Sequence, residues 1–163
     1  MKRPMFPKMP ILACDFDGTI VEDKYPKIGK PIEGAIDTLK LWQSMGGKVI
    51  LWTCRTDTNY LKPALDFLKE QGFTPDAVND HISELKAKGF NSKKVYADFY
   101  LDDHSLLNNY GADTGNSTVT LFSSMVTQYT LLKEILKKIY GDEEYYKAVS
   151  LKLYNNKTLF DEQ

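Results

Sequence analysis

Short apolar runs alternate with amphipathic segments along the first two thirds of the chain. The apolar runs at residues 11–16, 48–53, 77–79, 95–101 and 119–122 predict strands. Apolar positions recur about every 3.6 residues between 32 and 45, and again between 61 and 68, which predicts two helices that end at the glycines following them. Alternating strands and helices are typical of an α/β protein with a parallel sheet. We therefore expect a three-layer α/β sandwich with a central parallel sheet and helices on both faces.

The last third of the chain is predicted to be helical. An apolar stripe recurs there at four- and three-residue spacing, at Met125, Tyr129, Leu132, Leu136 and Ile139, and a second helix is expected at 143–153. The stripe favours packing against the sheet and leaves self-association into a homo-oligomer as the alternative. No repeat or linker divides the chain, so we expect one domain over residues 1–163, with a catalytic core at about 10–123 and C-terminal helices at about 124–154.

The first predicted strand leads into two carboxylates, Asp15 and Asp17, and then a Gly-Thr turn. Side chains two residues apart on an extended chain point the same way. Two like charges so close together repel each other unless a cation lies between them. Carboxylate oxygens suit Mg²⁺, which often bridges to a substrate phosphate. This stretch therefore predicts a magnesium-dependent phosphate site.

Other polar side chains follow the neighbouring strands. Thr53 ends the second strand, and Asp102 and Asp103 follow the fourth. Because ligands of open parallel sheets bind at the carboxyl ends of strands, these side chains are expected to join the same site. A lysine pair, Lys93-Lys94, comes directly before the fourth strand and offers a cation.

The order Asp-x-Asp-Gly-Thr, then Thr, then Lys, then Asp-Asp resembles the four motifs of the haloacid-dehalogenase superfamily phosphatases, over residues 10–105. The resemblance implies a Rossmann-like core with strand order 5-4-1-2-3. The segments between the motifs are too short to contain a cap domain. The chain is most similar to small capless hydrolases of bacteria and phages, which tend to have open sites.

The roles that phosphoryl transfer requires can be distributed over these residues. Asp15 is the expected nucleophile, forming an aspartyl-phosphate, and Asp17 the general acid and base. Thr53 is expected to donate its hydroxyl to a phosphate oxygen. Lys94, favoured over Lys93 because it adjoins the strand, is expected to offset charge on the transferring group. Arg55 follows Thr53 by two and is expected either to reach the substrate phosphate or to brace the acidic pair.

The expected cofactor is Mg²⁺, which would screen the repulsion between nucleophile and phosphate. Its expected ligands are Asp15, Asp17, Asp102 and Asp103, and the resemblance implies that Asp17 also presents its backbone carbonyl. Asp98 lies four residues before Asp102, roughly 13 Å away on a regular strand, so we interpret it as structural.

The formal net charge of −1 does not indicate a nucleic-acid-binding protein. The polar segment 21–34, which we call the flap, contains Lys24, Tyr25, Lys27 and Lys30, so binding of a nucleotide or nucleic-acid end stays open beside a simple solvated flap. No apolar run approaches the ~20 residues of a membrane span, and the N-terminus lacks the apolar region of a signal peptide, so we expect a cytoplasmic protein. The two cysteines are expected to be free thiols.

These observations predict a Mg²⁺-dependent phosphomonoester hydrolase whose substrate is a nucleotide, a sugar phosphate or a phosphorylated polymer end. One alternative is a response-regulator-like domain, which also uses clustered Asp, Thr and Lys on a parallel sheet. Another is a phosphate- or nucleotide-binding protein without turnover. The order of motifs, with Asp-x-Asp-Gly-Thr first and the acidic pair late, favours the hydrolase.

Overall fold

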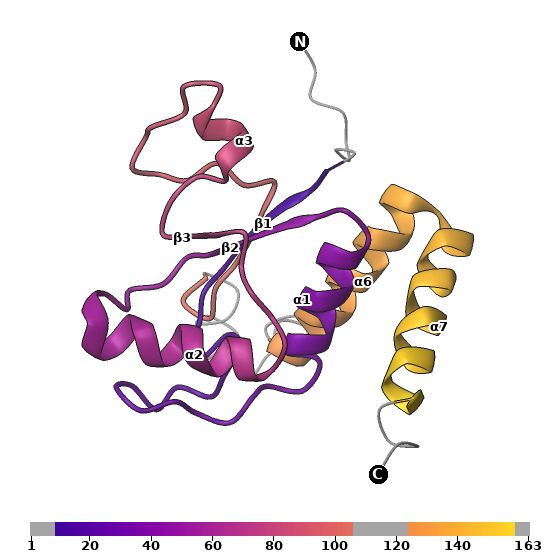
Figure 1. Ribbon diagram of the computed structural model, residues 1–163, viewed down its shortest axis with the longest axis horizontal. Helices are drawn as coiled ribbons and strands as arrows, with labels where there is room; N and C mark the ends of the chain where they lie inside the picture. Colours follow the sequence, from indigo (N-terminus) through magenta and orange to yellow (C-terminus); the bar gives the residue numbers. More distant parts are fainter. Residues whose placement is uncertain (1–8, 106–123, 159–163) are drawn as a thin grey trace, which may run out of the picture.

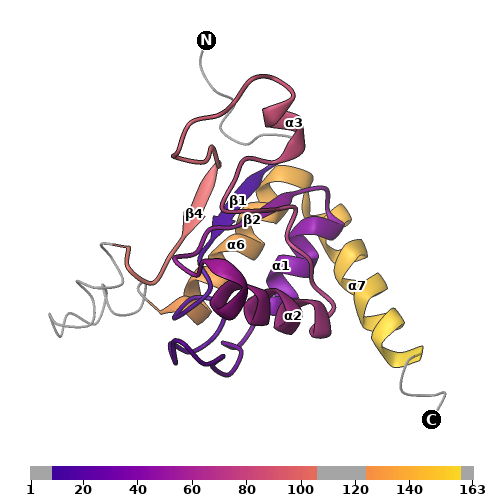
Figure 2. The same cartoon turned by 60° about the vertical axis from the view of Figure 1, so that its left-hand side comes forward.

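The computed structural model describes residues 9–105 and 124–158 of the chain, and its centre is a parallel sheet. Four strands lie in the order β3-β2-β1-β4; Figure 1 labels β1, β2 and β3, and Figure 2 labels β4 beside β1. Their bounds are β1 Ile11–Cys14, β2 Lys48–Leu51, β3 Ala77–Val78 and β4 Phe99–Leu101. Cys14 is level with Leu51 on one side and with Leu101 on the other. The strands β2, β1 and β4 therefore end at the same edge of the sheet.

Helices connect and flank these strands. They are α1 Ala35–Ser44, a π-helical turn η1 Asp57–Leu61 that continues into α2 Lys62–Glu70, α3 Ser83–Lys86, α6 Met125–Tyr140 and α7 Asp142–Thr158. Pro63 lies in the first turn of α2, the position at which a helix tolerates proline. None of the helices in the two described ranges is long and apolar enough to cross a membrane.

The strands bury both faces, which explains why their sequences are continuously apolar. Leu12 and Cys14 of β1 face a large core to which α1, α2 and α6 contribute. Ile11 and Ala13 face the opposite way, into a smaller cluster completed by the 80–98 segment that contains α3 (Figure 2). An α/β fold with a parallel sheet and flanking helices is therefore confirmed.

The C-terminal stripe packs into the same core as β1. Met125, Tyr129, Leu132 and Leu136 of α6 are buried there, and α6 lies beside α1 with α7 outside it (Figures 1 and 2). The interpretation of the stripe as a packing surface is confirmed for these four residues, whereas Ile139, the fifth, is half-buried.

One expected strand is untested and another is shorter than expected. The strand expected at 119–122 lies outside the described residues, so the complete five-strand order stays a prediction. The strand expected at 95–101 is regular only over β4. Ahead of β4, the Asp98 carboxylate accepts hydrogen bonds from the Ile11 backbone N–H at 2.9 Å and the Tyr96 hydroxyl at 3.2 Å. These contacts confirm the structural interpretation of Asp98.

Candidate active site

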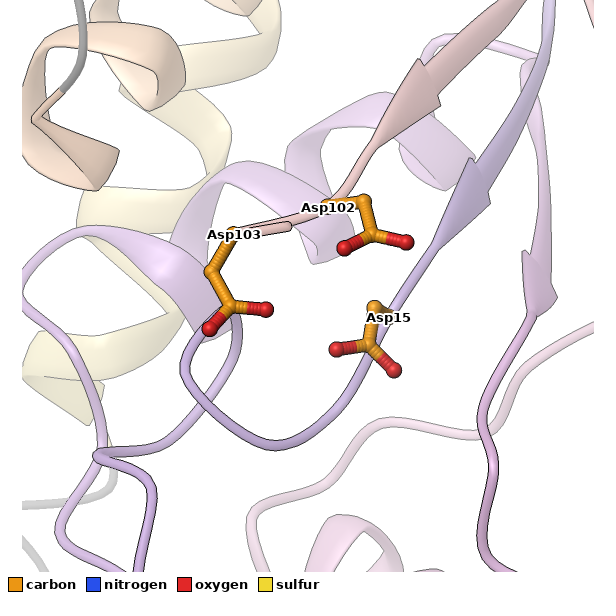
Figure 3. Close-up of side chains that lie close together, drawn as sticks. All are labelled: Asp15, Asp102 and Asp103. Atoms are coloured by element: carbon orange, nitrogen blue, oxygen red, sulfur yellow. The ribbon is translucent and has the colours of Figure 1, made fainter. Parts of the chain in front are cut away.

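Three carboxylates gather where β1 and β4 end. Asp15 directly follows β1, and its backbone N–H donates to the Leu101 carbonyl of β4 at 2.9 Å. Asp102 and Asp103 follow β4. Asp15, Asp102 and Asp103 each offer an oxygen within 4.8 Å of the other two (Figure 3). We call these three residues the acidic cluster. The level register of the strands is what brings together carboxylates so far apart in sequence.

The Gly-Thr turn of the first motif holds one member of the cluster in place. Gly18 has a positive φ of 75°, and a Cβ added to it would lie 2.1 Å from Oδ2 of Asp103. The next residue, Thr19, accepts a hydrogen bond from the Asp103 backbone N–H on its Oγ1 at 3.0 Å. Behind the turn, the Tyr129 hydroxyl of α6 donates to the Thr19 carbonyl at 2.7 Å. Only glycine leaves room for the carboxylate at this point.

The environment of the acidic cluster disfavours the negative charge of its carboxylates. Burial raises the pKa of Asp15 to about 7; a backbone hydrogen bond from Phe16 acts against this shift, and the neighbouring carboxylates add to it. Burial also raises the pKa of Asp103. Oδ1 of Asp103 is buried and lacks a hydrogen-bond partner within the described part of the chain. Three hard oxygen donors and one unsatisfied buried oxygen fit a divalent cation such as Mg²⁺.

Asp17 does not join the acidic cluster with its side chain. Arg55 holds its carboxylate instead, with Nε donating to Oδ2 and Nη2 to Oδ1, each at 2.7 Å. This corrects two expectations. The Asp17 carboxylate is not among the oxygens of the acidic cluster, and Arg55 braces Asp17 rather than Asp102 and Asp103. The partner of Arg55 was missed because it depends on how the loops after β1 and β2 approach each other.

A pocket of about 830 Å³ opens over these groups. Its lining includes Asp15, Asp17, Thr53, Arg55 and Asp102, so five expected site residues meet in one cavity. Thr53 accepts a hydrogen bond from the Arg55 backbone N–H on its Oγ1 at 3.1 Å. With this bond accepted, the hydroxyl proton of Thr53 stays available to an acceptor in the pocket.

Asn79 and His104 are among the lining residues that were not assigned to the site from the sequence. Asn79 directly follows β3, and its Oδ1 accepts a hydrogen bond from the Thr53 backbone N–H at 2.8 Å. A polar residue after a strand was the signal that could have revealed it. His104 follows the acidic pair and also lines the pocket.

Lys94 is the one expected catalytic residue that the structure does not bring to the site. It is exposed, and its ammonium lies 5.6 Å from the centre of the Tyr100 ring. Since β4 runs parallel to β1 toward the cluster, a residue ahead of β4 lies at the amino edge of the sheet, opposite Asp102. The sequence favoured Lys94 because it comes directly before the strand. That same position places Lys94 at the amino edge of the sheet, away from the acidic cluster.

The fold and the cluster define an α/β protein with a carboxylate site at the carboxyl edge of its parallel sheet. No family model and no curated protein matches the chain. A solved structure, described as that of a conserved protein coded by a locus of Bacteroides thetaiotaomicron, is similar, with a TM-score of 0.55 and 33% sequence identity. The match covers 74% of this chain and 91% of that one. The chain therefore belongs to the same family as that conserved protein, whose description states no activity.

Proposed function

We propose that this protein is a Mg²⁺-dependent phosphomonoester hydrolase of the haloacid-dehalogenase type, acting through an aspartyl-phosphate on Asp15. The observation that carries the proposal is the acidic cluster, in which Asp15 follows β1 and meets Asp102 and Asp103 at the end of β4. The proposal includes the finer features of that fold, a capless Rossmann-like sandwich with strand order 5-4-1-2-3.

The acidic cluster is the proposed metal site. Asp15, Asp102 and Asp103 would hold Mg²⁺, which when bound neutralises charge that otherwise repels an anionic phosphate. The unsatisfied buried oxygen of Asp103 supports this assignment, because a buried carboxylate oxygen without a partner is costly.

The chain's own residues divide the reaction into two displacements. An oxygen of Asp15 attacks phosphorus while Asp17 gives a proton to the departing alcohol oxygen, leaving an aspartyl-phosphate. Asp17 then takes a proton from water as that water attacks phosphorus, which releases inorganic phosphate and restores the Asp15 carboxylate. The Thr53 hydroxyl donates to a phosphate oxygen during both steps.

The proposed substrate class is a phosphate monoester larger than the phosphate itself. The pocket of about 830 Å³ leaves room for the remainder of a nucleotide, a sugar phosphate or a phosphorylated polymer end. Tyr25 of the flap and Trp52 after β2 provide aromatic surface in the same pocket.

Phosphate release from an aryl phosphate and from a panel of nucleotides and sugar phosphates, with Mg²⁺ or with EDTA, tests the proposal. Wild type should release phosphate only with Mg²⁺, and Asp15→Asn should not. Asp66→Asn is the matched control, because Asp66 is an exposed carboxylate on α2 that pairs with Lys62. Equal release by Asp15→Asn, or in EDTA, would contradict the covalent mechanism. Release from no compound would favour the non-catalytic phosphate-binding domain.

A further inference from the structure

The guanidinium of Arg55 is buried beside the pocket that it helps to line. The side chain is only 1% exposed and lies between two aromatic rings, with its central carbon 5.2 Å from the centre of the Phe16 ring and 5.1 Å from that of Tyr25. A charge buried this deeply is stable only when it is paired and hydrogen-bonded. Asp17 supplies the opposite charge at 2.7 Å.

Arginine has five N–H donors, and the structure accounts for all of them. Two reach the Asp17 carboxylate. The other three reach backbone carbonyls, those of Pro26 at 3.0 Å, Lys27 at 2.9 Å and Tyr60 at 3.1 Å. With every donor occupied, Arg55 has none to offer a substrate phosphate.

The partners of Arg55 come from three separate segments. Asp17 belongs to the loop after β1, Pro26 and Lys27 belong to the flap, and Tyr60 belongs to η1. The Tyr25 ring that covers the guanidinium is also part of the flap. One side chain therefore joins the flap to the carboxylate expected to transfer the proton.

We propose that Arg55 is a positioning residue, which orients Asp17 for proton transfer and fastens the flap over it, and does not bind the substrate phosphate. This inference rests on the proposed function. Each carboxylate oxygen of Asp17 accepts one hydrogen bond from Arg55 and keeps a second lone pair. Since Asp17 also lines the pocket, it can still exchange a proton with a ligand bound there.

The chemistry of the leaving group distinguishes this role from phosphate binding. A 2,4-dinitrophenolate leaves without a proton, whereas an alkoxide requires one, so an error in the general acid slows the alkyl ester much more. Because Asp17 also serves the hydrolysis of the aspartyl-phosphate, which is common to both esters, the comparison uses kcat/KM, which reports formation of that intermediate alone. On an alkyl phosphate, Asp17→Asn should lower kcat/KM about 10²-fold or more, with a far smaller effect on 2,4-dinitrophenyl phosphate. Arg55→Lys keeps the charge and loses the bidentate fork, so its kcat/KM should show the same selectivity, at about tenfold or more.

The double variant completes the test. If Arg55 acts through Asp17, the Asp17→Asn/Arg55→Lys protein should lose little more on the alkyl ester than Asp17→Asn alone. Equal losses of kcat/KM on the two esters in Arg55→Lys would overturn the proposal. Losses of kcat/KM that add up in the double variant would overturn it as well. Wild-type turnover that survives Asp15→Asn would instead contradict the proposed function itself.

A flap variant keeps the proposal testable if Arg55→Lys does not fold. Tyr25 is 55% exposed, so Tyr25→Leu should fold while removing the ring that covers the guanidinium. We expect it to slow the alkyl ester more than the dinitrophenyl ester. Tyr146→Leu on α7, where the side chain is 56% exposed, is the matched control and should behave as wild type. Equal effects of Tyr25→Leu on the two esters would contradict the role of the flap.

Discussion

Asp15 makes the stability of the metal-free protein depend on pH. Its pKa is about 7 in the folded protein, against an ordinary value of 3.8. Between these values the folded chain binds more protons than the unfolded chain, so the free energy of unfolding falls as the pH rises from about 4 to about 7. Asp15→Asn should flatten this dependence and raise the Tm of the metal-free protein at pH 8. Thermal unfolding in EDTA across this range measures both, and parallel curves for the two proteins would contradict the shift.

Gly18→Ala should disable the site by steric contact. The new Cβ would lie 2.1 Å from Oδ2 of Asp103, so the carboxylate has to move. A displacement on the order of 1 Å can lower turnover about 10²-fold. Gly89→Ala is the matched control, because Gly89 has a similar φ of +86° with nothing within 4 Å of the added Cβ. Both variants should lose about 1–2 kcal/mol to backbone strain, and only Gly18→Ala should lose Mg²⁺ affinity and activity. Similar activities of the two would show that the close approach to Asp103 is unimportant.

At the scale of elements, α6 braces the loop of the first motif. The buried Tyr129 donates to the Thr19 carbonyl, and Thr19 in turn holds the Asp103 backbone. Tyr129→Phe should lower the free energy of unfolding by about 1–3 kcal/mol, since it removes one partner of a buried hydrogen bond. Turnover should fall at temperatures where the variant remains folded. Denaturant unfolding and steady-state kinetics test this, with the exposed Tyr146→Phe of α7 as control. If Tyr129→Phe had the free energy of unfolding and the turnover of wild type, α6 would not support the site.

How far the site could be predicted depends on which elements its residues follow. Asp15, Thr53 and Asp102 each come after an apolar run, and parallel strands bring their carboxyl ends to one edge. The Asp17–Arg55 pair depends on the path of two loops, which no periodicity encodes. The short helix α3 lies between the strands expected at 77–79 and 95–101, where no helical repeat of apolar positions predicted it.

At the scale of the whole molecule, the C-terminal third belongs to the same core as the motif-bearing strands. The motif resemblance ends at about residue 105, yet Tyr129, Leu132 and Leu136 of α6 belong to the same core cluster as Leu12 of β1. The strands therefore depend on a segment that carries none of the motifs. Removing α6 and α7 would expose this core, so these helices are structural for the sheet as well as for the Thr19 turn.

Metal binding should accordingly stabilise the whole fold. The acidic cluster forms only when β1 and β4 are paired, so a cation held there binds the folded state and not the unfolded chain. Mg²⁺ at about 100 times its Kd should add about 2.7 kcal/mol, which for a chain of this size raises the Tm by about 5–10 °C. The increase should grow from pH 6 to pH 8, because protons compete with the metal for Asp15. Asp102→Asn should show little of this Mg²⁺-dependent increase in Tm, whereas Asp66→Asn should show all of it. An equal rise in all three proteins would mean that Mg²⁺ acts by general ionic strength, and the acidic cluster would then not be a metal site.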